Sequence, residues 1–213
     1  MRAINHRGIE FHVVIASIVL LSCARAMEAP ESPERPRPLQ AKARVYFVPV
    51  GRFPQAALEQ LPAYFKSKKG LAIEVLPTIP IDRTAFDSNR RQLIAEELIG
   101  LMMRGYPSLA RDPDSILVGL TVGDMYIRAK PEWRYAFAAG DTVRFAVVSS
   151  ARMDPMNYRQ PPDAERLGLR LRKMVSKYIG YMYFQLPSNS DRRSVMYSPI
   201  LSVDDLDSIG EDY

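Results

Sequence analysis

The segment from Asp163 to Pro199 reads DAERLGLRLRKMVSKYIGYMYFQLPSNSDRRSVMYSP and guides the interpretation of the rest of the chain. Its first part predicts an amphipathic helix from Asp163 to Leu186, because apolar residues recur at intervals of three and four. The residues of this stripe are Leu167, Leu171, Met174, Val175, Tyr178, Ile179 and Met182. Asp163 can cap the start of the helix, and Pro187 ends it. After a polar turn, a short apolar piece carries Met196.

A long helix followed by a loop with a buried methionine resembles the metzincin zinc peptidases, and in particular the archaemetzincins. In that family the helix carries the motif H-E-x-G-H, whose histidines bind zinc and whose glutamate is the general base. Aligned on Gly180, the resemblance places Lys177 at the first histidine, Tyr178 at the glutamate and Tyr181 at the second histidine. Met196 would then be the methionine of the turn that lies below the metal site.

The residues at these positions are poor zinc ligands. Lys177 is a cation at neutral pH, and a phenol with a pKa of about 10 replaces an imidazole poorly. The family's third ligand would fall around Pro187, which has no donor atom. The chain has one cysteine and two histidines, and all three precede residue 24. The remaining carboxylates suit Ca²⁺ or Mg²⁺ better than Zn²⁺. We therefore expect no zinc, although the family uses it.

The resemblance covers roughly residues 42–207. Its further segments are Arg44–Gly51, Ala72–Pro77, Arg91–Leu93, Leu117–Tyr126 and Phe145–Arg152. It implies an α/β (α+β) fold, in which a metzincin-like mixed sheet is packed with helices. The implied function is that of a catalytically inactive metallopeptidase homologue, a pseudoenzyme. The alternative is an active zinc-dependent metallopeptidase or another hydrolase with atypical ligands. Separately, Lys177 could form a catalytic pair with a loop serine.

Local patterns give the same fold class. Alternating or continuous apolar runs predict strands at 43–50, 71–76, 115–121, 123–128 and 144–149. Helical spacing predicts helices at 55–69 and 89–104, and a strand–helix–strand order implies a parallel pair with a right-handed crossover. Residues 129–141 are expected to form a loop or hairpin. The acidic tail from Asp204 is expected to be a short helix that frays into solvent. Glu96 and Glu97 are adjacent on a helix and suit a solvated face better than a catalytic pair.

The N-terminus predicts export. Residues 1–26 resemble a signal peptide with an apolar core at 11–21, residues 27–41 form a proline-rich linker, and residues 42–213 form the domain. Two cleavages remain open: after Ala26 by an ordinary signal peptidase, or before Cys23, which would become a lipidated first residue. The product would be periplasmic, a cell-envelope lipoprotein or secreted. An uncleaved N-terminal anchor is the alternative, and membrane contact is expected only through this leader or the lipid.

The charge of the chain bounds its partners. A formal net charge of +5 without a dense basic run makes nucleic acid an unsuitable partner. The basic residues of the key helix predict a solvated face or an anion-binding surface. These residues are Arg166, Arg170, Arg172, Lys173 and Lys177. Lys177, Tyr181 and Tyr126 are candidates for a ligand cleft, in which an edge strand near residues 123–128 would pair with an extended peptide or protein segment. Alternatively, the tyrosines only fill the volume of a lost metal site. The sequence gives no indication of oligomeric state.

Overall fold

The computed structural model describes residues 43–213, and the signal peptide, Cys23 and the linker predicted for residues 1–41 lie outside this range. The described residues contain a five-stranded main sheet whose central strands are parallel. Its spatial order is β2 (Ile73–Val75), β1 (Arg44–Pro49), β5 (Ser115–Thr121), β8 (Phe145–Ser149) and β7 (Ala138–Gly140). Only the last pairing of this sheet, between β7 and β8, is antiparallel. The predicted α/β fold with a mixed sheet is confirmed.

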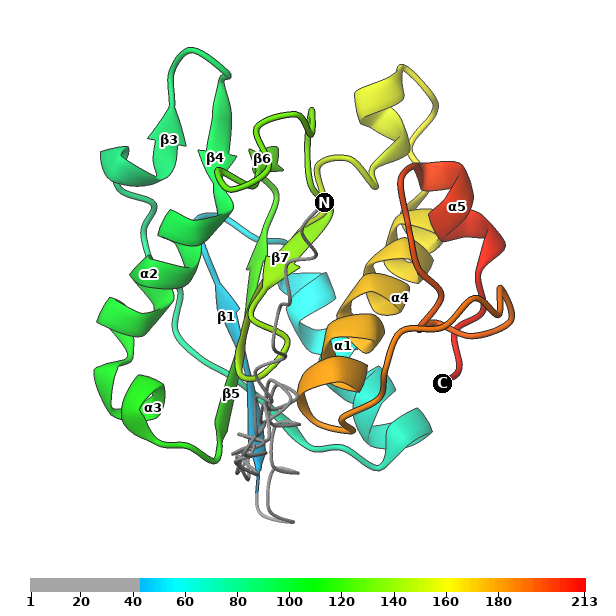
Figure 1. Cartoon of the computed structure of the whole chain (residues 1–213), viewed down its shortest axis with the longest axis horizontal. Helices are drawn as coiled ribbons and strands as arrows, with labels where there is room; N and C mark the ends of the chain where they lie inside the picture. Colours follow the sequence, from blue (N-terminus) through cyan, green and yellow to red (C-terminus); the bar gives the residue numbers. More distant parts are fainter. Residues whose placement is uncertain (1–42) are drawn as a thin grey trace, which may run out of the picture. The chain divides into compact units, whose positions relative to one another are not determined.

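Helices cover both faces of the main sheet (Figure 1). On one face lie α1 (Gln55–Lys69) and α4 (Ala164–Met182), and on the other lie α2 (Ala95–Gly105) and α3 (Pro107–Arg111). The central strands β1 and β5 are therefore buried on both sides, which explains their nearly continuous apolar sequences. No helix within residues 43–213 has the length and apolar character that a membrane crossing needs.

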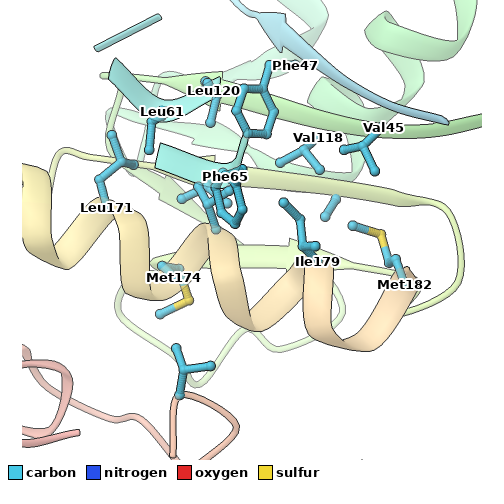
Figure 2. Packing of buried hydrophobic residues seen from close by; sticks show 14 of the residues in the cluster. Val45, Phe47, Leu61, Phe65, Val118, Leu120, Leu171, Met174, Ile179 and Met182 are labelled. Atoms are coloured by element: carbon cyan, nitrogen blue, oxygen red, sulfur yellow. The ribbon is translucent and has the colours of Figure 1, made fainter. Parts of the chain in front are cut away.

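Side chains that alternate along β1 enter two separate cores. Val45 and Phe47 point towards α1 and α4, whereas Tyr46 and Val48 pack on the side of α2. Figure 2 shows the first core, in which Phe47 and Phe65 meet edge to face with ring centroids 6.1 Å apart. The apolar stripe of α4 packs on this core from the side opposite the sheet through its large, buried side chains. Figure 2 labels Leu171, Met174, Ile179 and Met182 of this stripe.

The predicted second helix began too early. Residues Gln92–Ile94 form strand β4, and α2 starts only at Ala95. A second, three-stranded sheet contains β3 (Phe86–Asp87), β4 and β6 (Met125–Tyr126). The local helical pattern was overridden because β4 pairs in parallel with β6, a contact between segments about thirty residues apart. The other described elements are the 3₁₀ turns Arg83–Ala85 and Pro155–Tyr158, and α5 (Val203–Ser208).

The C-terminal tail forms the predicted short helix but does not fray into solvent. Arg170 of α4 makes a bidentate ion pair with Asp207, at 2.7 and 2.6 Å. The Nζ of Lys173 donates to the backbone oxygens of Leu206 and Asp207, both at 3.1 Å. The hydroxyl of Tyr213 donates to the carbonyl of Ser176 at 3.1 Å. The tail is therefore packed along the outer side of α4.

This packing corrects the prediction of a solvated basic face for three of its five residues, whereas Arg166 is exposed and Arg172 is partly buried. Arg170, Lys173 and Lys177 are buried, with 4%, 4% and 7% of their surfaces exposed. A helix face rich in Arg and Lys ordinarily remains in water, because burying a charge costs free energy unless the charge finds a partner. For Arg170 and Lys173 the tail supplies these partners, which are carboxylate and carbonyl oxygens. The helical pattern alone could not reveal them.

Leu206 of the tail and Leu201, which precedes the tail, test whether the tail belongs to the core. Leu206 is fully buried, whereas Leu201 is 67% exposed. We expect Leu206→Ala to lower the free energy of unfolding by about 2–5 kcal/mol, because it leaves a cavity beside α4. Leu201→Ala, the matched control, should change it by less than about 0.5 kcal/mol. Urea denaturation of both variants measures the difference; equal, small effects would show that the tail is not part of the folded core.

Candidate functional site

A pocket of about 520 Å³ lies at the β7 edge of the main sheet, on the side of α4. One wall is the face of α4 that carries Met174, Lys177, Tyr178 and Tyr181. These positions are spaced by three or four residues, so they share a helix face. The other walls are residues 133–138 with Thr142, and residues 198–201. The pocket is thus built from three segments that are distant in sequence.

The structure brings Lys177, Tyr178 and Tyr181 together, as their spacing predicted. The rings of Tyr178 and Tyr181 meet edge to face, with centroids 5.8 Å apart and an interplanar angle of 86°. The Nζ of Lys177 lies 5.6 Å from the centroid of the Tyr181 ring. A cation this close to an aromatic face is attracted to it, although the attraction is weaker than that of an ion pair.

Lys177 is a buried cation without a carboxylate partner. Its Nζ donates a hydrogen bond to the carbonyl of Tyr197. No Asp or Glu is among the residues that line the pocket. Burial therefore lowers the pKa of Lys177 from 10.5 to about 8, with no opposing charge to raise it. The side chain remains mostly an ammonium at pH 7 and carries an unneutralised charge at the bottom of a largely apolar pocket.

The two tyrosines are neutral hydrogen-bonding groups at physiological pH. Burial raises the pKa of Tyr178 well above its usual value, and the neighbouring Tyr181 adds to this shift. Burial also raises the pKa of Tyr181, although a hydrogen bond with Ser188 partly opposes it. Tyr178 packs beneath the edge strand: a Cβ placed on Gly140 would lie 2.9 Å from its Cε1. A larger residue at Gly140 would therefore push into the pocket wall.

Met196 lies directly against α4. It is 2% exposed, and a Cβ placed on Gly180 would lie only 2.5 Å from its Sδ. Its backbone N–H donates to the Oγ of Ser194 at 3.0 Å, and the N–H of Val195 donates to the carbonyl of Asp212 at 2.7 Å. The methionine loop is thus fixed by the helix on one side and the C-terminal tail on the other.

The side chains in this place do not fit a zinc ion. Lys177 is protonated and already donates to Tyr197, so it offers no lone pair at neutral pH. Tyr178 and Tyr181 hold their protons because burial raises their pKa. Pro187 is exposed and does not line the pocket. Within residues 43–213, no group of three His, Cys, Asp or Glu side chains is placed to hold a metal ion.

Tyr126 does not lie in the pocket, contrary to our expectation. It belongs to β6 in the small sheet, where its hydroxyl donates to Asp87 at 2.8 Å and its ring lies 4.0 Å from the guanidinium carbon of Arg90. The segment 123–128 is likewise not the strand beside the pocket. Its pairing with β4 takes it into the second sheet, so the edge strand at the pocket is β7.

Sequence reasoning missed two of the three pocket walls. Residues 133–138 were expected to be a loop or hairpin without a role, and residues 198–201 were assigned none. One signal was present: Trp133, Tyr135 and Phe137 alternate, which places large aromatic side chains on one side of an extended segment. The rings of Tyr135 and Phe137 pack edge to face at 5.3 Å. Their place opposite α4 depends on contacts that no local pattern encodes.

Arg90 fixes the backbone of the pocket wall that carries Trp133, Tyr135 and Phe137, called the aromatic wall below. Its guanidinium donates to the carbonyls of Pro131, Trp133 and Arg134 at 3.2, 2.7 and 3.2 Å. Gln92 adds a hydrogen bond from its amide nitrogen to the carbonyl of Arg134 at 2.9 Å. The small sheet therefore has a structural role at the site, because it positions the backbone of the wall without lining the pocket.

Solved structures of archaemetzincins share this fold. AmzA from Archaeoglobus fulgidus is 20% identical, with a TM-score of 0.63 over 80% of this chain and 94% of that one. AmzA from Methanopyrus kandleri is 22% identical, with a TM-score of 0.63 over 82% and 91%. A zinc-dependent peptidase from Methanocorpusculum labreanum is 19% identical, with a TM-score of 0.66 over 79% and 95%. The archaemetzincin-like fold inferred from the sequence is confirmed.

Sequence comparisons alone find no relative. No protein-family model matches the chain, and no curated protein matches it. At about 20% identity, the structural similarity establishes the fold and leaves the chemistry of the site to the residues themselves.

Two glycines of α4 test the contact with Met196. Gly180→Ala should lower the free energy of unfolding by about 1–3 kcal/mol, because the new methyl group overlaps Met196 and Tyr213. At Gly168 a Cβ would meet only Arg172, at 3.5 Å, so Gly168→Ala should stabilise the helix by about 0.5–1 kcal/mol. Thermal denaturation of both variants measures these opposite signs. Two stabilising substitutions would contradict the close packing of the methionine loop.

The burial of Lys177 predicts a specific pH dependence. Between pH 8 and 10.5 the unfolded lysine is protonated and the folded one is not, so raising the pH favours the folded state. Wild-type protein should therefore gain stability relative to Lys177→Met across this range, by an amount on the order of 3 kcal/mol. Urea denaturation of both proteins from pH 7 to 10.5 measures this difference, and other titrating groups cancel in the comparison. A constant difference would refute a buried, unpaired ammonium.

Proposed function

We propose that this protein is an exported, catalytically inactive protein of archaemetzincin-like fold, whose pocket binds an extended peptide or protein segment. The observation that carries the proposal is the buried ammonium of Lys177, at the position where the resemblance expects the first zinc-binding histidine. This cation repels Zn²⁺ and cannot coordinate it without losing its proton. Zinc is therefore not assigned as a cofactor, and no hydrolytic step is assigned to the pocket.

The general base of a metallopeptidase is also lacking. In such enzymes a carboxylate takes a proton from the metal-bound water. Tyr178 stands at that position, and burial raises its pKa, so it keeps its proton at neutral pH and cannot accept another from a water. No carboxylate lines the pocket to replace it. The catalytic alternative would therefore require both a new metal site and a new base.

The edge of the main sheet supports peptide binding. Phe137 accepts a hydrogen bond from the N–H of Ser149, and Asp141 donates to the carbonyl of Phe145. In an antiparallel pair, residues whose backbone N–H and C=O groups bond to the partner strand alternate with residues whose groups point away from it. The backbone groups of Ala138 and Gly140 therefore point away from β8. Within residues 43–213, β7 is the terminal strand on this side. An extended segment can add to that edge through backbone hydrogen bonds.

The pocket beside this edge can receive a side chain of such a segment. Alternate residues of a bound strand would project to the α4 side, where the aromatic walls are. The exposed apolar groups at the site, Trp133 at 45% and Leu201 at 67%, would lose contact with water on binding. Aromatic side chains are enriched in protein-binding surfaces relative to the rest of a protein's surface.

Export and anchoring are proposed from the leader alone. A basic start, an apolar core at residues 11–21 and a cleavage site with small residues are typical of secretory signals. A lipid at Cys23 would place the domain in the cell envelope at the end of a proline-rich tether, whereas cleavage after Ala26 would release it. Mass spectrometry of the mature protein distinguishes these outcomes, and an intact Met1 would contradict export.

Metal content and hydrolysis test the inactive assignment. Purified protein incubated with zinc and then dialysed should contain far less than one zinc atom per chain by plasma mass spectrometry. It should also show no peptide hydrolysis that 1,10-phenanthroline abolishes. The double variant Lys177→His with Tyr181→His is the positive control, because two imidazoles four residues apart on a helix can share a metal ion. Stoichiometric zinc together with chelator-sensitive hydrolysis in the wild type would overturn the proposal.

A further inference from the structure

The charges that line the pocket are unbalanced. Its charged residues are the buried Lys177 of α4 and the exposed Arg134 of the segment 133–138; neither Asp nor Glu is among them. The other cations of α4 differ from Lys177 in this respect. Arg170 is paired with a carboxylate, and Lys173 donates to two backbone oxygens. Among these three buried cations, Lys177 is the one that faces the pocket.

We propose that the pocket binds the C-terminal residue of its peptide ligand, with the terminal carboxylate on the ammonium of Lys177 and an apolar side chain between the aromatic walls. This inference rests on the proposed function, because it specifies which part of the peptide enters the pocket. It also assigns Lys177 a role as the anion-binding residue of the site.

The hydrogen-bonding capacity of Lys177 supports a carboxylate. An ammonium has three donors, and the carbonyl of Tyr197 uses one of them. An incoming carboxylate can accept the others in charge-assisted hydrogen bonds, which are stronger than bonds between neutral groups. Such a partner also offsets the free energy that the empty protein loses by burying an unpaired cation. The site therefore gains more from an anionic ligand than from a neutral one.

The surroundings of Lys177 favour a chain terminus over an acidic side chain. The other residues of the pocket present mainly apolar surface, which includes Met174, Tyr178, Pro199 and Ile200. A C-terminal apolar residue carries its carboxylate and its side chain on the same Cα, so both enter together. An internal Asp or Glu would place only a charged group in this apolar space. The volume of about 520 Å³ lies within the range of about 300–1,000 Å³ that is typical of ligand sites.

The adjacent edge strand favours a peptide over a fatty acid. A fatty acid also combines an apolar body with a carboxylate, but it has no groups to pair with a strand. The outward backbone groups of Ala138 and Gly140 belong to β7, and the first residue of β7 lines the pocket. The residues that precede a C-terminus bound at Lys177 can hydrogen-bond with them. This combination of strand edge, apolar walls and buried cation defines the expected ligand.

Binding can be measured with a synthetic peptide pair. The probe is an N-acetylated hexapeptide of alternating serine and valine that ends in leucine with a free carboxylate; the matched control ends in a carboxamide. Titration calorimetry with the purified full chain gives both dissociation constants. We expect the carboxylate peptide to bind at least about tenfold more tightly, as one charge-assisted hydrogen bond allows. Trp133, the single tryptophan of the chain, reports pocket occupancy by fluorescence.

Two lysine variants show where the carboxylate binds. Lys177→Met keeps the length of the side chain and removes its charge, so it should abolish the preference for the carboxylate over the carboxamide. Lys130→Met is the matched control, because Lys130 is exposed and does not line the pocket. It should retain the preference. Thermal denaturation of each variant verifies that the loss reflects binding and not unfolding.

The possible failures are distinguishable. Equal binding of the two peptides, with Trp133 still responding, would overturn the C-terminal assignment and leave peptide binding in place. A preference that survives Lys177→Met would also overturn it. Binding of decanoate with no binding of either peptide would refute both the assignment and the proposed peptide-binding function.

Discussion

Most side chains of α4 from Arg170 to Met182 are buried, and this burial governs both the stability of the domain and the character of its pocket. One side of the helix packs on the main sheet through Leu171, Val175 and Ile179, and the tail covers another. Burying a cation costs free energy unless it is paired. Arg170 and Lys173 obtain oxygen partners from the tail, whereas Lys177 obtains a single carbonyl and opens onto the pocket.

The archaemetzincin-like frame of the domain is held together by packing. The helix, the methionine loop and the sheet are held by packing contacts, such as Met196 against Gly180, that do not require an ion. In their present form Lys177, Tyr178 and Tyr181 make contacts with one another and with neighbouring backbone. The fold alone does not fix the function, because function depends on a small set of side chains placed on a scaffold.

Several parts of the structure followed from local patterns. Helix α1 matches its predicted bounds because Gln55–Lys69 has buried apolar positions, basic residues in its last turn and Gly70 in a left-handed conformation at its end. Strand β5 also matches, since a continuous apolar run of seven residues suits a central parallel strand. The start of α2 and the position of Tyr126 in the small sheet did not follow from local patterns, because β4 and β6 pair across a long separation in sequence.

The sequence by itself determined that the domain has the archaemetzincin-like order of elements, that Lys177, Tyr178 and Tyr181 share a helix face, and that residues 43–213 contain no imidazole or thiol. The order of elements was implied by the resemblance to archaemetzincins, whereas the other two features follow from helical spacing and residue identity. The tertiary structure decided that Lys177 is buried without a carboxylate, and that the segments near Trp133 and Ile200 form the pocket with it. The physical reason is that burial and charge balance arise from contacts between distant segments, which a local pattern does not contain.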